Sequence, residues 1–254
     1  MPIDYLRTLS GKERTRDANR HLGFILAFVA GGINAGGFLA VQRYTSHMTG
    51  LVSEMADSLV LGAQDVALAA LGALVCFLMG AMSSTVLVHY SRRHHMHSEY
   101  ALPLLLEAAL LLCFGVVGGQ LNQVDGLFVS ATVMLLSFMM GLQNAVITKL
   151  SQAEIRTTHV TGIVTDIGIE LGRVIYWNAS KAPNKPPVVA NWDRLRVLTW
   201  LVLSFFVGGV LGALGFKHLG YSATIPLAIL LVALASIPVV DDLQGMVKQR
   251  QGGR

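Results

Sequence analysis

The sequence predicts an all-α integral membrane protein with six transmembrane helices and two re-entrant half-helices, arranged as an inverted 3+3 repeat. Composition, long uncharged runs and a duplicated motif lead to this fold class. Of the 254 residues, 53% are hydrophobic and only 13% are charged. Soluble domains carry about twice that share of charged residues. The composition therefore excludes an ordinary soluble globular protein.

Six apolar stretches are long enough to cross a bilayer. An α-helix rises about 1.5 Å per residue, so a hydrocarbon layer of about 30 Å requires about 20 residues. Five stretches contain no Asp, Glu, Lys or Arg, and the third contains only Glu107, which we expect to snorkel to the interface. The six stretches are residues 21–42, 66–91, 100–124, 126–148, 197–216 and 218–240.

Basic residues assign the loops to the two sides of the membrane. Residues 1–20 form a basic segment without the apolar core of a signal peptide, and we place them in the cytoplasm. The Arg92 and Arg93 loop, the stretch 173–196 and the tail 241–254 are also expected to be cytoplasmic. Because these charges lie at the ends of apolar runs, they indicate membrane orientation and no nucleic-acid partner.

Two shorter segments, residues 48–62 and 160–172, are better explained as re-entrant half-helices than as spans. Each is amphipathic, and at 13 to 15 residues each is too short to cross the hydrocarbon layer. If residues 48–62 crossed, the Arg92 loop would move to the outside, against its basic charge.

A motif repeats in the two halves of the chain. Asn34, in a Gly-rich stretch, is followed 13 residues later by His47 in the segment Thr-Ser-His-Met-Thr-Gly. Asn144 is followed 15 residues later by His159 in the segment Thr-Thr-His-Val-Thr-Gly. Residues 21–124 and 126–240 therefore form two membrane repeats. Because each contains three full spans, the second must be inverted relative to the first, as in many transporters.

The repeated segment also predicts a binding site near the membrane centre. An extended chain over residues 43–47 would descend about 16 Å, and a half-helix capped by Thr49 would then start there. Thr161 would cap the second half-helix. Helix N-termini offer unpaired N–H groups and a partial positive charge, which suit an anion or a polar solute. The predicted substrate-binding residues are His47, Thr49, Gly50, His159, Thr161, Gly162, Asn34 and Asn144.

Each candidate also has a structural explanation. The two histidines could tie down their turns by bonding the backbone, and Asn34 and Asn144 could satisfy the broken backbone of the adjacent segment. Glu54 and Asp166 occupy equivalent places and are the candidates for ion coupling. Alternatively, they could pair with Arg43 and Arg156 or face water. Asp57 and Glu170, one turn further along, are expected to be solvated.

The paired segments GGINAGGFLAVQRYTSHMTG and MGLQNAVITKLSQAEIRTTHVTGIVTDIGIELG resemble the YoaK-like family of bacterial inner-membrane proteins over nearly the whole chain. This sequence departs from the family pattern at Asn34 and Leu51, where the family has Asp and Asn. The resemblance implies about six spans and a location in the bacterial inner membrane. It implies no activity, because the family's domain has no assigned function.

A secondary transporter or facilitator of a small polar or anionic solute fits these features best. A channel for an ion or neutral solute is the alternative, and so is a membrane enzyme or sensor that uses the paired histidines and carboxylates. The sequence contains no catalytic motif, metal-ligand cluster or cofactor fingerprint. The lipid bilayer and a small solute or ion are the expected partners, and Gly-rich faces in the third and fifth spans are compatible with a homodimer.

Overall fold

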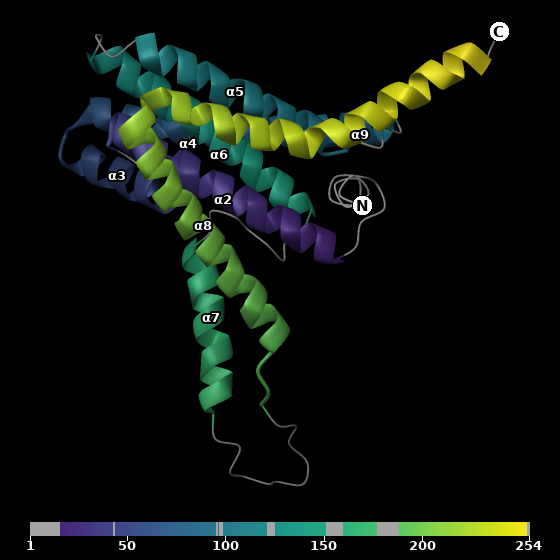
Figure 1. Ribbon diagram of the computed structural model, residues 1–254. Coiled ribbons are helices and arrows are strands. Elements are labelled where there is room, and N and C mark those ends of the chain that lie inside the picture. The colour runs from purple at the N-terminus through teal and green to yellow at the C-terminus, as the bar shows by residue number, and fades with distance from the viewer. Residues whose placement is uncertain are drawn as a thin grey trace.

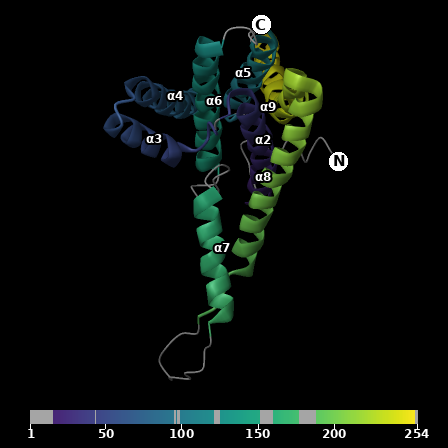
Figure 2. The ribbon, with the colours of Figure 1, turned by 90° about the vertical axis from the view of Figure 1, so that its left-hand side faces the viewer.

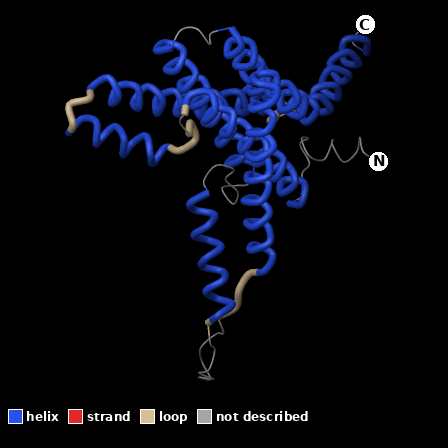
Figure 3. The backbone as a smooth tube through the Cα atoms, turned by 60° about the vertical axis from the view of Figure 1, so that its left-hand side comes forward, coloured by secondary structure: helices blue, strands red, loops and turns tan. Residues whose placement is uncertain are grey.

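Every regular element in the part of the chain described by the computed structural model is a helix (Figures 1 and 3). The structure describes residues 16–42, 44–94, 96, 99–120, 125–150, 160–176 and 188–252. The elements are α2 (Arg16–Val41), α3 (Met48–Val60), α4 (Gln64–Arg93), α5 (Ala101–Gln120), α6 (Asp125–Leu150), α7 (Val160–Ile175), α8 (Trp192–Leu219), the 3-10 turn η1 (Gly220–Ala223) and α9 (Thr224–Gly252).

The long helices have the length and composition of membrane spans. Within the described residues, five stretches are long and apolar enough to cross a bilayer, and the last, Trp192–Ser236, runs through α8, η1 and the start of α9. Large apolar side chains on α4 and α8, such as Leu68, Met82 and Phe206, are exposed on the surface of the chain. Such faces suit contact with lipid. The chain is therefore an all-α, multi-pass membrane protein.

The helices lie close to the ranges expected from the sequence, and their ends follow local polar signals. Helix α8 begins at Trp192, before the expected residue 197, because the Asn191 side chain caps it by accepting a hydrogen bond from the Arg194 N–H at 3.0 Å. Helix α9 continues past Val240 to Gly252, into the segment assigned to the cytoplasmic tail.

Among the described helices, α3 and α7 are the two short ones. With 13 and 16 residues, they are about 20 and 24 Å long, less than the thickness of the hydrocarbon layer. Each forms a hairpin with the following long helix, α3 with α4 and α7 with α8, and the two hairpins point in different directions (Figure 2).

Four glycines allow two pairs of long helices to cross at backbone contact. Where α2 crosses α8, a Cβ atom added at Gly31 would lie 2.0 Å from the Phe205 carbonyl oxygen. One added at Gly208 would lie 2.0 Å from the Phe28 carbonyl oxygen. The α4–α6 crossing repeats this geometry: a Cβ atom added at Gly141 or Gly80 would lie 2.0 Å from the carbonyl oxygen of Phe77 or Phe138. The first long helix of each half therefore packs on the second long helix of the other half.

The contacts also fix the directions of these helices. Helices α2 and α8 run in the same direction, because their contacts pair Phe28 with Gly208, then Gly32 with Gly212, and then Gly36 with Phe216. Helices α4 and α6 also run in the same direction, since Gly72 faces Met134 and Gly80 faces Leu142. Helices α2 and α6 run in opposite directions, with Leu26 near Gln143 and Gly37 near Leu136.

The third long helices of the two halves, α5 and α9, pack together. A Cβ atom added at Gly115 would lie 2.2 Å from the Thr224 hydroxyl oxygen, and Gly118 lies against the ring of Tyr221 in η1. The Phe114 and Tyr221 rings meet edge to face with their centroids 5.5 Å apart. This pair completes a buried apolar core shared by α2, α5, α6, α8 and α9.

Candidate functional site

The turn between α2 and α3 contains the first copy of the repeated motif, and two of its polar residues, Thr45 and Ser46, lie against the long helices. Thr45 is only 1% exposed. The Ser46 hydroxyl donates a hydrogen bond of 2.9 Å to Oδ1 of Asn34 on α2. The Ser137 hydroxyl on α6 donates one of 3.4 Å to the carbonyl oxygen of Thr45. The turn is therefore anchored to two long helices beside the first turn of α3.

One buried polar atom in this turn has no partner among the residues that the structure describes. The Thr45 hydroxyl oxygen is buried and forms no hydrogen bond within the described residues. It lies close to α2, since a Cβ atom added at Gly37 would be 3.7 Å away. Buried hydroxyls nearly always form hydrogen bonds. Thr45 is therefore a candidate contact for a polar ligand.

Two expectations for this segment are wrong. The chain does not descend in an extended form, because Tyr44–His47 is a turn in which the His47 N–H donates to the Tyr44 carbonyl oxygen at 3.5 Å. Thr49 is not the N-cap of α3. The Leu51 N–H bonds the His47 carbonyl oxygen at 3.1 Å, which makes His47 the cap and puts Thr49 inside the first turn.

His47 lies exposed at the start of α3, and its side chain forms no capping hydrogen bond. Its imidazole lies over Gly50, where an added Cβ atom would be 2.2 Å from the ring carbon Cδ2. Thr49 is exposed beside it. Gly50 therefore provides the space in which the His47 ring lies against the helix.

The second copy of the motif is described only in part. His159 and Arg156, like Arg43 of the first copy, lie outside the described residues. Helix α7 begins at Val160, so Thr161 is a helical residue and not the expected N-cap. Thr161 is exposed and Gly162 half-buried. Asn144 donates a hydrogen bond of 2.9 Å to the Met140 carbonyl oxygen of its own helix, whereas Asn34 bonds the neighbouring turn.

The structure joins Asn34 to the turn of the first copy but does not pack the two short helices α3 and α7 against each other. Asn34, Thr45, Ser46 and Ser137 are linked through the turn, whereas α3 packs on α4 and α7 on α8 (Figure 2). Thr45 and Ser46 belong to the repeated motif, so the sequence contained a signal for them. Ser137, a single hydroxyl within an apolar span, gave none.

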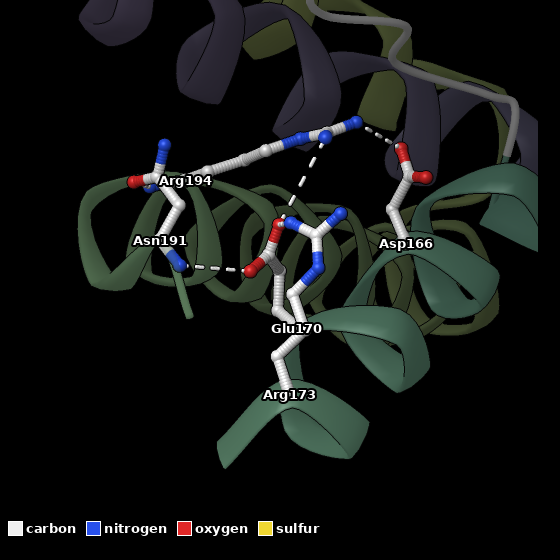
Figure 4. A network of polar contacts seen from close by, with 5 residues as sticks. All are labelled: Asp166, Glu170, Arg173, Asn191 and Arg194. Carbon is white, nitrogen blue, oxygen red and sulfur yellow. Dashed lines mark hydrogen bonds and ion pairs between the residues drawn. The ribbon is translucent and has the colours of Figure 1, made fainter. Parts of the chain in front are cut away.

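A charged cluster holds α7 to the start of α8 (Figure 4). Asp166 forms an ion pair of 2.9 Å with Arg194. Glu170 is only 1% exposed, and its Oε2 accepts the Asn191 N–H at 2.8 Å. Its Oε1 lies 2.9 Å from Arg173 and 3.9 Å from Arg194. We call these five residues the α7–α8 clamp.

Two further expectations, about the exposure of Glu170 in the clamp and of Glu107 on α5, are wrong. Glu170 was expected to be solvated, but it is buried, because the folding back of α8 brings Asn191 and Arg194 over it. Glu107 was expected to snorkel to the interface, but it is 0% exposed. On α3, Glu54 is half-buried and Asp57 exposed.

The described residues contain no group of three or more His, Cys, Asp and Glu side chains arranged to hold a metal ion. The described polar groups near α3 are hydroxyls, amides, helix N–H groups and one exposed imidazole. Those of the clamp are paired charges. Hydroxyl, amide and helix N–H groups can bind a polar or anionic solute.

Comparison with known proteins identifies the family. No curated protein and no solved structure matches the chain. Residues 22–237, from the start of α2 to well into α9, match a family described as "Protein of unknown function (DUF1275)". YoaK-like proteins belong to this family, so the resemblance seen in the sequence is confirmed. The chain is a member of the DUF1275 family of proteins of unknown function.

Proposed function

We propose that this protein is a secondary transporter or facilitator of a small polar or anionic solute in the bacterial inner membrane. The observation that carries the proposal is the anchored turn before α3. It keeps the Thr45 hydroxyl, which has no hydrogen-bond partner among the described residues, buried between α2 and α6, next to the N-terminal turn of a half-helix. The first N–H groups of a helix have no partners within it, so they are available to a ligand.

Helix directions support the inverted repeat. Helices α2 and α6, the first long helices of the two halves, run in opposite directions. The parallel pairs α2–α8 and α4–α6 agree with the charge bias, since the first pair starts and the second pair ends at basic segments. Counting α8 and α9 as separate crossings gives six spans with both termini in the cytoplasm.

The short lengths of α3 and α7 support the re-entrant interpretation, because neither helix reaches across the hydrocarbon layer. Each would enter and leave on one side, α3 from outside and α7 from the cytoplasm. The site would then include His47, Thr49, Gly50, Asn34 and Thr45 from the first half. His159, Thr161, Gly162 and Asn144 would contribute in a conformation that brings α7 closer.

Packing suggests which parts would move. Because α2 crosses α8 at backbone contact and α4 crosses α6 likewise, each pair is a rigid unit that includes helices from both repeats. Helices α2, α7 and α8 would rock against α3, α4 and α6 about the α2–α6 crossing. The α7–α8 clamp would move with the first unit, and Asp166 or Glu54 could contribute to ion coupling there.

Ligand binding is the first test. The detergent-solubilised protein is screened by thermal shift against inorganic anions, amino acids and nucleobases, since a ligand that binds the native state raises its melting temperature. For a ligand found in this way, we expect Thr45→Val to remove most of the shift, because it removes the buried hydroxyl without changing the shape. Thr165→Val is the matched control, since Thr165 bonds its own helix at Thr161 on the exposed face of α7.

Flux into liposomes then separates the transport modes. A carrier gives saturable uptake and counter-transport, whereas a channel gives flux that does not saturate. Equal binding by wild type, Thr45→Val and Thr165→Val would remove the site from the proposal.

A further inference from the structure

Glu107 is a carboxyl group inside the apolar core of α5. It lies on the helix stripe that also contains Tyr100, Leu104, Leu111 and Phe114, at the spacing of one helical face. All five residues are buried, and Glu107 is 0% exposed. Neither of its carboxyl oxygens has a hydrogen-bond partner within the described residues.

No described cation neutralises this group. The helices that pack against α5 are α4, α6 and α9, together with η1. Arg92, near the start of α5, is bound instead to Glu99 at 2.9 Å and to the Tyr100 hydroxyl at 3.0 Å. None of the described titratable side chains on these elements forms an ion pair or hydrogen bond with Glu107. These side chains are Asp65, Cys76, His89, Tyr90, Arg92 and Arg93 of α4, His94 that follows it, Lys149 of α6 and Tyr221 of η1.

A second unpartnered polar atom lies at the same depth. Helices α4 and α6 run in the same direction, and the short link after α4 returns the chain at the start of α5. Helix α5 therefore runs opposite to α6. Glu107 lies about two turns from the start of α5, and Gln143 lies about two turns from the end of α6. Gln143 is 0% exposed, and its Oε1 also has no described partner.

The two protonation states of Glu107 fit this packing very differently. A carboxylate here would have neither a counter-ion nor a donor among the described residues, which is unfavourable inside protein and membrane. The neutral acid carries no net charge and fits the apolar stripe. Loss of the proton therefore requires α5 to shift against α6 and α9, so that water or a donor reaches the carboxylate.

We propose that Glu107 is a proton-binding site, occupied in this conformation and emptied to water when the packing of α5 changes. The O–H bond breaks, the proton leaves to water, and the electron pair stays on the carboxylate. Because binding and conformation are linked reciprocally, proton release then favours the shifted packing. The coupling of proton release to solute transport rests on the proposed transport function. Proton binding at Glu107 does not rest on it.

Glu107 is better placed for this role than the two carboxylates suggested by the repeat. Asp166 is already paired with Arg194 at 2.9 Å, and Glu54 is half-buried on α3. Both are therefore more accessible to water or to a cation than Glu107, and their protonation is less strongly tied to helix packing.

Infrared spectroscopy of the full-length protein in liposomes, without any solute, tests the proposal. The C=O stretch of a protonated carboxyl group is separate from the bands of a carboxylate. We expect a protonated-acid band at neutral pH in wild type and in Asp57→Asn, the matched control at an exposed carboxylate of α3. Glu107→Gln should lack that band. Raising the pH should remove it from wild type while the helices remain folded.

Two results would overturn the proposal. In the first, Glu107→Gln removes no protonated-acid band at neutral pH. In the second, the band persists at high pH until the protein unfolds, which would make Glu107 a permanently neutral core group. Should Glu107→Gln fail to fold, Glu107→Asp keeps the carboxyl group and should shift the band. Failure of liposome transport would leave this result unaffected, so the two proposals can be distinguished.

Discussion

At the residue scale, the fold depends on a few glycines at helix crossings. Gly80 lies against the backbone of α6, where an added Cβ atom would be 2.0 Å from the Phe138 carbonyl oxygen. Gly168 on α7 has nothing within 4 Å of such an atom. Both are helical, so only the space around them distinguishes them.

We predict that Gly80→Ala destabilises the protein by about 1–3 kcal/mol, the usual range for overpacking, because α4 must move away from α6. Gly168→Ala should be neutral or stabilising by up to about 1 kcal/mol, since alanine favours a helix over glycine. Thermal unfolding in detergent measures both. Equal melting temperatures for the two variants would contradict the close crossing.

Some of these residues could be predicted from the sequence, and others could not. Asn34 and His47 could be selected because their motif occurs twice, and repetition is visible without coordinates. Ser137 and Gln143 could not, because a single polar residue in an apolar span has no periodic signal. The burial of Glu170 was missed because its partners Asn191 and Arg194 lie on the next helix, beyond a long link.

At the element scale, the α7–α8 clamp holds a short helix to a long one. Glu170 accepts the Asn191 N–H and Arg173 from a buried position, whereas the ion pair between Asp166 and Arg194 is more exposed. Buried polar groups that lose a partner cost more than exposed ion pairs.

We predict that Glu170→Ala loosens α7 from α8 at a cost of about 1–3 kcal/mol, because it leaves the Asn191 N–H and the Arg173 guanidinium without their acceptor. Asp166→Asn, which changes only the exposed pair, should cost about 0–1 kcal/mol. Hydrogen exchange across α7 reports the opening. Similar exchange rates in α7 for both variants would show that Glu170 does not hold the hairpin.

Helix positions were predicted well at the element scale, and helix caps less well. The apolar runs and the amphipathic segments located α2 to α9, because span length is set by the bilayer. Helices α3 and α7 begin at Met48 and Val160, as expected, but Thr49 and Thr161 lie inside them and are not their caps. For α3, the cap is His47, because the chain closes a tight turn at Tyr44–His47 that no residue propensity specified.

At the scale of the whole molecule, the two halves are interwoven. The sequence suggests two sequential repeats, but the crossings pair α2 with α8 and α4 with α6. This exchange could not be predicted from either half alone, because at each crossing the matching glycines and phenylalanines lie in different halves of the chain. In the proposed transport cycle, the bodies that move would therefore be the units built on the α2–α8 and α4–α6 pairs, and not the two repeats.

The proposed inverted arrangement would place the α3–α4 turn outside and the α7–α8 link in the cytoplasm. The most direct measurement is labelling of single cysteines by a membrane-impermeant thiol reagent in intact and permeabilised cells. The background replaces Cys76 and Cys113 by alanine, and the probes are Leu61→Cys and Val189→Cys, both at exposed positions. We predict that Leu61→Cys reacts in intact cells and Val189→Cys only after permeabilisation. Labelling of both positions from the same side would contradict the inverted repeat and the site built on it.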